Sequence, residues 1–201
     1  AMKIVIIGAS GTVGRAVTEE LSRRHEVIRV GRTQGDHQVD ITSQASVQAL
    51  FEKIGPVDAI VSASGGLHFG PLATMTDGEF NQGLQDKLLG QVRLALNGQH
   101  YLNEGGSITL ISGIVAHEPI AQGVNATTVN AALEGFVRAA ACELPRGIRI
   151  NLISPTVLTE SAEAYDGFFP GFESVPAATV AQAYRRSVEG VQSGRVYKVG
   201  Y

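Results

Sequence analysis

Three glycines recur at three-residue spacing near the start of the chain, at Gly8, Gly11 and Gly14. They follow the apolar run Lys3–Ile7 directly, and a helical pattern opens beside the last of them. Glycine allows a tight turn at the first position, close approach of the backbone to a phosphate at the second, and close helix packing at the third. Backbone N–H groups at the helix start then face the phosphate oxygens. The pattern predicts a dinucleotide-binding loop; the alternative is a glycine-rich turn with no ligand.

The residues after the second apolar run, Glu26–Val30, indicate which dinucleotide to expect. A site for NAD carries an acidic side chain there for the ribose 2′-hydroxyl, whereas a site for NADP carries a cation for the 2′-phosphate. This chain has no acid at that point but has Arg32, followed by Thr33. A guanidinium pairs well with phosphate, and Ser10 can add a hydroxyl to the same pocket. We therefore predict NADP(H) in preference to NAD(H); the alternative is a solvated surface arginine.

Short apolar runs alternate with longer helical patterns along the chain. The runs predict strands at Lys3–Ile7, Glu26–Val30, Asp58–Ser62, Ser107–Ser112, Arg149–Ile153 and Arg195–Val199, with a further short strand at His37–Asp40. The longer patterns predict helices at Val13–Arg24, Ser43–Lys53, Asp77–Leu102, Thr127–Leu144 and Ala177–Glu189, with Thr127 and Thr128 capping the fourth. Runs such as Ile4–Ile7 are apolar throughout, which indicates a parallel sheet buried on both faces. We predict an α/β fold of the Rossmann type, a doubly wound parallel sheet of about seven strands with helices on both faces.

Length and composition fit one dinucleotide-binding domain over residues 2–201, since 44% of the residues are hydrophobic and 17% are charged. The net charge of −3 gives no basic surface for nucleic acid. No apolar run approaches the ~18 residues that would span a membrane. A single cysteine, Cys142, cannot form an internal disulfide, so we expect a cytoplasmic protein. The segment 165–176, rich in Gly, Pro and Phe, is predicted to be a lid over a substrate site.

Motifs along nearly the whole chain resemble those of the short-chain dehydrogenase/reductase family. Besides the glycine loop, they are Val39–Ile41 after the third strand, Ser62–Gly65 in place of the Asn-Asn-Ala-Gly element, the strand Gly105–Ser112, the helix segment Ala131–Arg138, and Gly147–Pro155 followed by Thr156. The resemblance implies a nicotinamide cofactor held by Gly8, Ser10, Gly11, Thr12, Val13, Gly14, Arg32, Thr33, Asp40, Ile41, Ser62, Ala63, Ser64, Gly65, Lys87, Pro155, Thr156 and Val157. It also implies a homodimer or homotetramer built through the helices predicted at Asp77–Leu102 and Thr127–Leu144.

The catalytic residues that the family uses are replaced in this chain. The family carries Asn, Ser, Tyr and Lys, and the Tyr-x-x-x-Lys spacing puts an ammonium beside a phenol on one helical face, where it lowers the phenol's pKa. The alignment implied by the resemblance places Ala126 at the tyrosine position and Asn130 at the lysine position. It places Gly113 at the serine position and Lys87 at the asparagine position. Carbonyl reduction by the family's usual proton donor is therefore not expected.

We hypothesise that the family's lysine and asparagine have exchanged positions in this chain. Lys87 and Asn130 would keep a cation and an amide near the nicotinamide ribose, with Lys87 binding ribose hydroxyls or stabilising negative charge on a substrate oxygen. The alternative is a solvent-facing lysine and a polar residue near a helix start. Ser112, at the end of its strand, can hydrogen-bond a substrate carbonyl. His117, in the following loop, is a further candidate proton donor.

Two functions are compatible with these residues. The first is an NADP-dependent oxidoreductase that transfers hydride to or from a small carbonyl or alcohol, with Ser112, Lys87 and Asn130 in a rearranged site. The second is a non-catalytic NADP(H)-binding sensor or interaction protein. The cofactor loop, Arg32 and the lid favour the first, and the missing tyrosine and lysine favour the second. We favour the oxidoreductase. The five histidines and one cysteine show no metal-ligand spacing.

Overall fold

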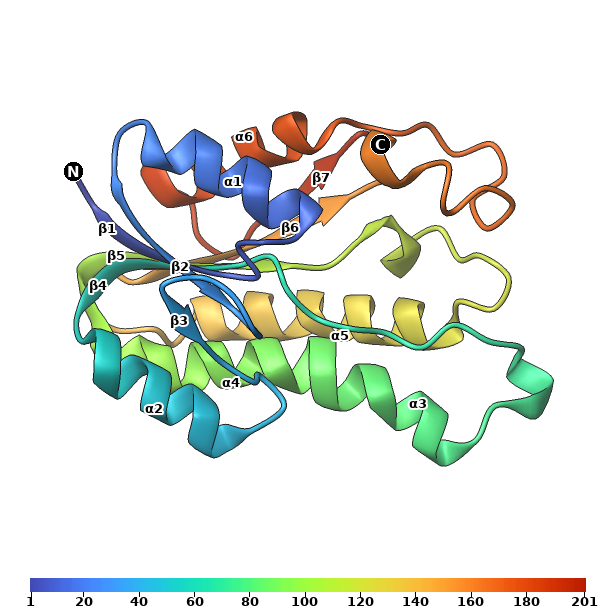
Figure 1. Ribbon diagram of the computed structural model, residues 1–201, viewed down its shortest axis with the longest axis horizontal. Helices are drawn as coiled ribbons and strands as arrows, with labels where there is room; N and C mark the ends of the chain where they lie inside the picture. Colours follow the sequence, from blue (N-terminus) through green and yellow to red (C-terminus); the bar gives the residue numbers. More distant parts are fainter.

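The computed structural model describes residues 1–201, and its centre is one parallel sheet in the order β3-β2-β1-β4-β5-β6-β7 (Figure 1). The strands are β1 (Lys3–Ile7), β2 (Glu26–Gly31), β3 (His37–Gln38), β4 (Val57–Ser62), β5 (Leu102–Ile111), β6 (Arg149–Pro155) and β7 (Val196–Val199). The predicted doubly wound sheet of seven strands is confirmed. The strand order reverses between β1 and β4, and a crevice opens beyond the carboxyl ends of the strands at such a point.

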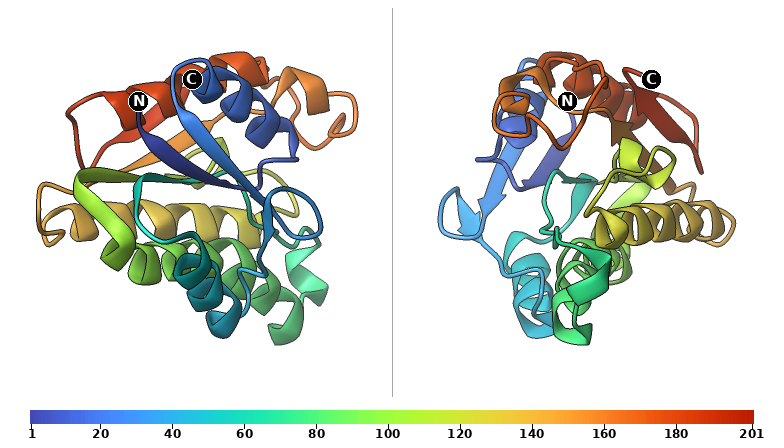
Figure 2. Two further views of the ribbon diagram at one scale, coloured as in Figure 1. Left: turned by 60° about the vertical axis from the view of Figure 1, so that its left-hand side comes forward. Right: turned by 90° about the vertical axis from the view of Figure 1, so that its right-hand side faces the viewer.

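Helices cover both faces of the sheet (Figures 1 and 2). One layer holds α1 (Thr12–Ser22) and α6 (Ala177–Glu189), and the other holds α2 (Gln44–Ile54), α3 (Asp77–Gly83), α4 (Leu89–Gly98) and α5 (Val124–Ala141). Alternate residues of β1 enter the two cores: Val5 and Ile7 pack in the α2–α4–α5 layer, and Ile4 and Ile6 in the α1–α6 layer. This two-sided burial explains the uninterrupted apolar runs. None of the helices is long and apolar enough to cross a membrane.

The helix predicted at Asp77–Leu102 runs without a gap to Tyr101, but it is not α-helical throughout. It consists of α3, a π-helical turn at Leu84–Leu88, α4, and a 3₁₀ turn that ends at Tyr101. The π-helical turn has a tertiary cause, because the side-chain amide of Asn125 in α5 donates to the carbonyl of Phe80 at 2.6 Å. The backbone amide of Leu84 therefore donates to the carbonyl of Asn81 instead. An inserted side chain of this kind interrupts the helical hydrogen-bond ladder.

Three predicted element boundaries are displaced by three or more residues: both ends of the helix predicted at Thr127–Leu144, which ends at Ala141, and the start of one strand. Helix α5 begins at Val124 rather than Thr127, so the threonines do not cap it. The hydroxyl of Thr127 donates to the carbonyl of Val115 at 2.7 Å, and that of Thr128 to the carbonyl of Val124 at 2.8 Å. Strand β5 begins at Leu102, five residues before the predicted start, because Leu102 pairs with Val57 across an irregularity in β4.

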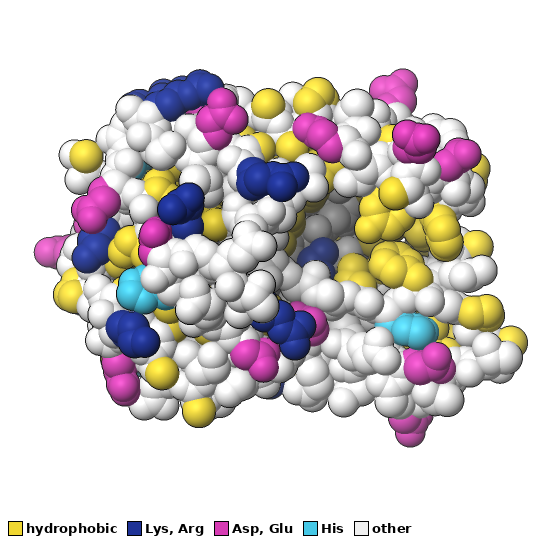
Figure 3. Space-filling view, in the orientation of Figure 1, with side chains coloured by type: hydrophobic (Ala, Val, Ile, Leu, Met, Phe, Trp, Pro, Cys, Tyr) yellow, Lys and Arg dark blue, Asp and Glu magenta, His cyan; other side chains and the backbone are white.

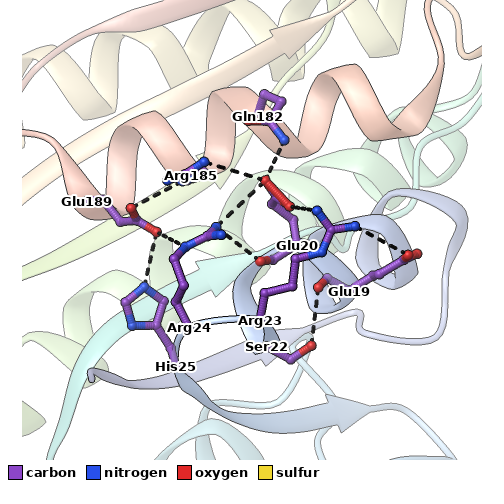
Figure 4. Close-up of polar contacts among 9 residues, drawn as sticks. All are labelled: Glu19, Glu20, Ser22, Arg23, Arg24, His25, Gln182, Arg185 and Glu189. Carbon is purple, nitrogen blue, oxygen red and sulfur yellow. Dashed lines mark hydrogen bonds and ion pairs between the residues drawn. The ribbon is translucent and has the colours of Figure 1, made fainter.

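Polar side chains join the C-terminal part of α1 to α6 (Figure 4). The carboxylate of Glu20 is nearly buried, accepts a hydrogen bond from Gln182 at 2.5 Å and pairs with Arg23 at 2.9 Å. The Gln182 hydrogen bond and the nearby arginines hold the pKa of Glu20 below its usual value. A second carboxylate, Glu189, pairs with Arg24 at 3.3 Å. These contacts hold α1, which starts at the glycine loop, against α6.

Candidate active site

The glycine loop joins β1 to α1 at the point where the strand order reverses. Gly8 has a φ of +85°, a conformation that favours glycine, and a Cβ there would lie 2.8 Å from the carbonyl oxygen of Ala63. A Cβ on Gly14 would lie 1.8 Å from the carbonyl oxygen of Gly8, so the first helical turn touches the loop backbone directly. Gly11 is different, since the nearest atom to its Cβ position is 3.6 Å away. Open space therefore lies beside Gly11, where a ligand can approach the backbone.

A crevice of about 370 Å³ lies along this loop and reaches across the ends of β2 and β4. It is lined by these predicted cofactor residues: Gly8, Ser10, Gly11, Arg32, Asp40, Ile41, Ala63, Ser64 and Gly65. Three predicted residues line neither this crevice nor the cavity described below: Thr33 is exposed to solvent, Ser62 is buried in the sheet, and Gly14 packs against the backbone of Gly8. Sequence reasoning missed Ile7, Gly31, Val39, Thr42, Gly66 and Asp86, which also line the crevice.

Two charged side chains face the β2 end of the crevice. Asp40 accepts hydrogen bonds from the hydroxyl and the amide of Thr42, at 2.6 and 3.0 Å. These hydrogen bonds, helped by the positive charges of Arg32 and Arg93, lower the pKa of Asp40. The Asp-x-Thr spacing is an Asx-turn signal, so Thr42 could have been found from sequence. Arg32 is exposed and makes no ion pair with any carboxylate, which leaves its guanidinium free for an anionic ligand.

A second cavity of about 330 Å³ continues from the crevice, and the two share Ala63. It brings together the remaining predicted residues Thr12, Val13, Lys87, Ser112, Asn130, Pro155, Thr156 and Val157. The other lining residues are Leu67, Phe69, Gly113, Ile114, Val115, Leu158, Ser161, Tyr165 and Phe169, of which only Tyr165 and Phe169 belong to the predicted lid. In Figure 3 the face is hollowed near its centre, with a basic side chain deep in the hollow and hydrophobic side chains along its right-hand rim.

Lys87 lies in the π-helical turn and is only 8% exposed, so it does not face solvent. Its Nζ donates to the backbone carbonyl of Ser112 at 3.1 Å, and it pairs with no carboxylate. Burial lowers the pKa of Lys87 from 10.5 to about 8. The ammonium is therefore mostly protonated at neutral pH, yet it can release its proton near neutrality. Gly65 makes room for it, because a Cβ there would lie 2.6 Å from Cγ of Lys87.

Asn130 faces the cavity from α5 and is fully buried. Neither its Nδ2 nor its Oδ1 has a hydrogen-bond partner in the protein, which leaves a buried donor and a buried acceptor free for a bound molecule. Asn130 is not at a helix start, since α5 begins six residues before it. Ser112 is 3% exposed, and its hydroxyl lies 3.4 Å from the carbonyl oxygen of Ile153, which is a long and weak contact.

Two other titratable side chains, the candidate His117 and Tyr184, lie outside the cavity. His117 approaches Glu134 instead, with Nε2 at 2.7 Å from Oε2, and it does not line the cavity. Tyr184 is fully buried between α6 and the sheet, where its hydroxyl donates to the carbonyl of Ser62 at 2.7 Å. Ala126, at the aligned tyrosine position, is buried with Ile114 in a small apolar cluster. Tyr165, from the predicted lid, is the one phenol among the residues that line the cavity.

Comparisons with known proteins place the chain in a family. A family model described as enoyl-(acyl carrier protein) reductase matches residues 3–192. The hydroxynaphthalene reductase of Aspergillus fumigatus is 26% identical over 175 residues, which are 75% of this chain and 64% of that protein. The 3-oxoacyl-[acyl-carrier-protein] reductase of Aquifex aeolicus is 26% identical over 159 residues, which are 76% of this chain and 62% of that protein. The chain thus spans less than two thirds of the length of these two relatives.

Solved structures are similar over almost the whole chain. The protein lin1944 from Listeria innocua is 49% identical, with a TM-score of 0.98 over 99% of this chain and 100% of that one. A small-chain dehydrogenase in complex with NADPH is 27% identical, with a TM-score of 0.87 over 98% of this chain and 95% of that one.

Proposed function

The chain belongs to the short-chain dehydrogenase/reductase family, and on that premise we propose that it binds NADP(H) and transfers hydride between this cofactor and a small carbonyl or alcohol. One observation carries the proposal: Lys87, Ser112 and Asn130 line a single cavity that continues from the glycine-loop crevice. The NADPH complex of a structural relative supports the cofactor. The proposal treats residues 2–201 as one dinucleotide-binding domain, with the segment 165–176 as the lid of the cavity.

Lys87, Ser112 and Asn130 have different roles in the proposed reaction. NADPH, when bound, supplies the hydride that reaches the carbonyl carbon. Lys87 gives a proton to the carbonyl oxygen in reduction, because its depressed pKa makes the ammonium an effective acid near neutral pH. The neutral amine that remains is favoured by burial and regains its proton from water. Ser112 donates a hydrogen bond to the same oxygen, and the unpartnered amide of Asn130 orients ribose hydroxyls.

Arg32 is the proposed selector of NADP(H) over NAD(H), and calorimetric titration tests it together with the cofactor itself. We expect NADPH to bind more tightly than NADH. Arg32→Ala should weaken NADPH binding by about 10–100-fold, the value of a charge-assisted contact with phosphate, and leave NADH binding unchanged. Arg195→Ala is the matched control, because Arg195 is also exposed but precedes β7 at the opposite edge of the sheet. Equal affinities for both cofactors would contradict the role of Arg32, and no binding would contradict the proposal.

A second candidate function is a non-catalytic NADP(H)-binding sensor or interaction protein, and the observation in its favour is Ala126 at the position of the family's tyrosine. The two functions differ in turnover. A screen of NADPH oxidation against aldehydes, ketones and quinones separates them, since the oxidoreductase should turn over at least one class. Tight NADPH binding with no turnover across the panel would support the sensor.

We also propose that the protein forms a homo-oligomer through α4 and α5. An apolar groove runs between these helices and is lined by Leu96, Phe136 and Leu144 among others. Leu96 is 52% exposed, so the surface offers apolar area to a second copy. We expect a dimer or tetramer in sedimentation velocity at micromolar concentration, and a Leu96→Glu variant should dissociate it. A monomer for the native protein would contradict this part of the proposal.

A further inference from the structure

We infer that the substrate is an uncharged, largely apolar carbonyl compound with a flat ring, held against an aromatic wall formed by Phe69, Tyr165 and Phe169. The inference rests on the proposed hydride transfer at the same cavity. Three observations carry it: the charge of the lining residues, the arrangement of the rings, and the charge of the lid.

The lining contains one charged side chain, Lys87, among 18 residues, and 10 of the 18 are hydrophobic. Apart from Val13 in α1, the hydrophobic residues come from the three segments that follow β4, β5 and β6. Lys87 and Ser112 lie together at the floor, where the lysine donates to the serine carbonyl. The proposed mechanism uses both at the reacting oxygen. A charged group elsewhere on the substrate would therefore have no further charged side chain in the lining to pair with, and would lose part of its hydration.

The rings of the lid hold defined positions. Tyr165 and Phe169 meet edge to face with their centroids 5.9 Å apart, and Phe169 and Phe172 do so at 5.3 Å. Phe169 and Phe172 also pack against the buried cluster that contains Ile114. By contrast, Phe69 is 38% exposed and Tyr165 is 43% exposed although both line the cavity. Both side chains therefore have uncovered surface that can contact a flat ring, and aromatic pairs gain from stacked and edge-to-face contacts.

The segment that contains the lid is also negatively charged. Residues 157–176 include four acidic residues, two of them in the lid itself, and no lysine or arginine. Glu160 accepts hydrogen bonds from the backbone amide of Ala177, at 3.0 and 3.2 Å, while Glu163, Asp166 and Glu173 are exposed. A phosphorylated or carboxylated substrate would approach against this field. The lid and the lining thus disfavour anions for independent reasons.

Two ketones that differ by one charge test the inference. They are 2-acetylnaphthalene and 6-acetyl-2-naphthoate, each titrated calorimetrically into the NADP⁺-loaded protein and then assayed with NADPH. We expect the uncharged ketone to bind at least about 100-fold more tightly and to show a correspondingly higher kcat/KM, because the carboxylate must be desolvated in the cavity. The saturated analogue of 2-acetylnaphthalene should bind about 10-fold more weakly than the flat compound, since it loses the ring contacts.

Matched variants test which side chains cause these differences in ketone binding. Phe69→Ala and Tyr165→Ala should each weaken binding of 2-acetylnaphthalene by about 10-fold and leave NADPH affinity unchanged, which also shows that the variants are folded. The triple variant Glu163→Gln, Asp166→Asn, Glu173→Gln should strengthen binding of the naphthoate several-fold and leave the neutral ketone unaffected. Salt should reduce the difference between native and triple-variant protein, because the three carboxylates are exposed.

The failure of the inference is distinguishable from the failure of the proposed function. Equal or tighter binding of the naphthoate, or binding of neither ketone, overturns the substrate class even when NADPH binds and other carbonyls are reduced. Absence of NADPH binding overturns the proposed function instead. In that case the same two ketones, titrated into the protein alone, still report whether the cavity selects the uncharged ring.

Discussion

Gly14→Ala should weaken NADPH binding and also destabilise the fold, whereas Gly11→Ala should weaken binding alone. A Cβ on Gly14 would sit 1.8 Å from the carbonyl oxygen of Gly8, so α1 would have to move away from the loop it packs against. Overpacking of this kind costs on the order of 3 kcal/mol or more of unfolding free energy when backbone has to shift. The displaced helix would also carry its N-terminal amides away from the phosphate position.

Gly11→Ala provides the matched comparison at the same loop. Gly11 precedes α1 with φ −75° and ψ 175°, which alanine also adopts, and its Cβ would meet no atom closer than 3.6 Å. We expect its unfolding free energy to stay within about 1 kcal/mol of the native value. NADPH affinity should fall at least about 100-fold, because the added methyl occupies the space where the pyrophosphate approaches the backbone.

Urea unfolding without cofactor and calorimetric titration with NADPH separate these two expectations. A Gly11→Ala protein that binds NADPH as tightly as the native one would show that the pyrophosphate does not lie on this turn. A Gly14→Ala protein of native stability would contradict the close packing of α1 on the loop.

Lys87→Met should lower kcat for carbonyl reduction by about 100- to 1,000-fold, since a positioned acid and a buried cation each contribute on that scale. For the native protein, reduction should slow above about pH 8, where Lys87 loses its proton. The variant should lack this alkaline limb. Lys87→Arg is the discriminating partner, because a guanidinium keeps the charge but cannot give up a proton near pH 8. An arginine variant with native kcat would show that charge alone suffices.

The burial of Lys87 should also make the stability of the cofactor-free protein depend on pH. Burial lowers the pKa of Lys87 to about 8 in the folded protein, from 10.5. Between these two values the unfolded chain binds more protons, so the contribution of Lys87 to the unfolding free energy rises with pH. Below about pH 8 the buried charge of Lys87 lowers the unfolding free energy by about 3 kcal/mol, and this destabilisation is lost by about pH 10.5. Relative to Lys87→Met, the native protein should therefore gain stability between pH 7 and pH 10 in urea unfolding. A constant difference would contradict the burial of the charge.

Local patterns were sufficient for the sheet and the cofactor loop. Strand β1 and helix α6 have the predicted boundaries, because an uninterrupted apolar run and a helical period are properties of adjacent residues. The glycine spacing at Gly8, Gly11 and Gly14 likewise describes a turn and its neighbouring helix. The alternation of strands and helices along the chain then restricts the topology, since the crossovers between parallel strands are right-handed. In sheets of this kind, crevices lie at the carboxyl ends of the strands.

The chemistry of the cavity was decided by tertiary structure. The π-helical turn that carries Lys87 arises where Asn125, 38 residues further along the chain, takes the carbonyl of Phe80. The lowered pKa of Lys87 and the unpartnered amide of Asn130 are consequences of burial among residues from several elements. His117 shows the converse, since its sequence suggested a proton donor and the fold directs it to Glu134. Spacing along the chain determines which backbone conformations form, whereas burial and protonation depend on neighbours that are distant in sequence and that only the folded packing brings together.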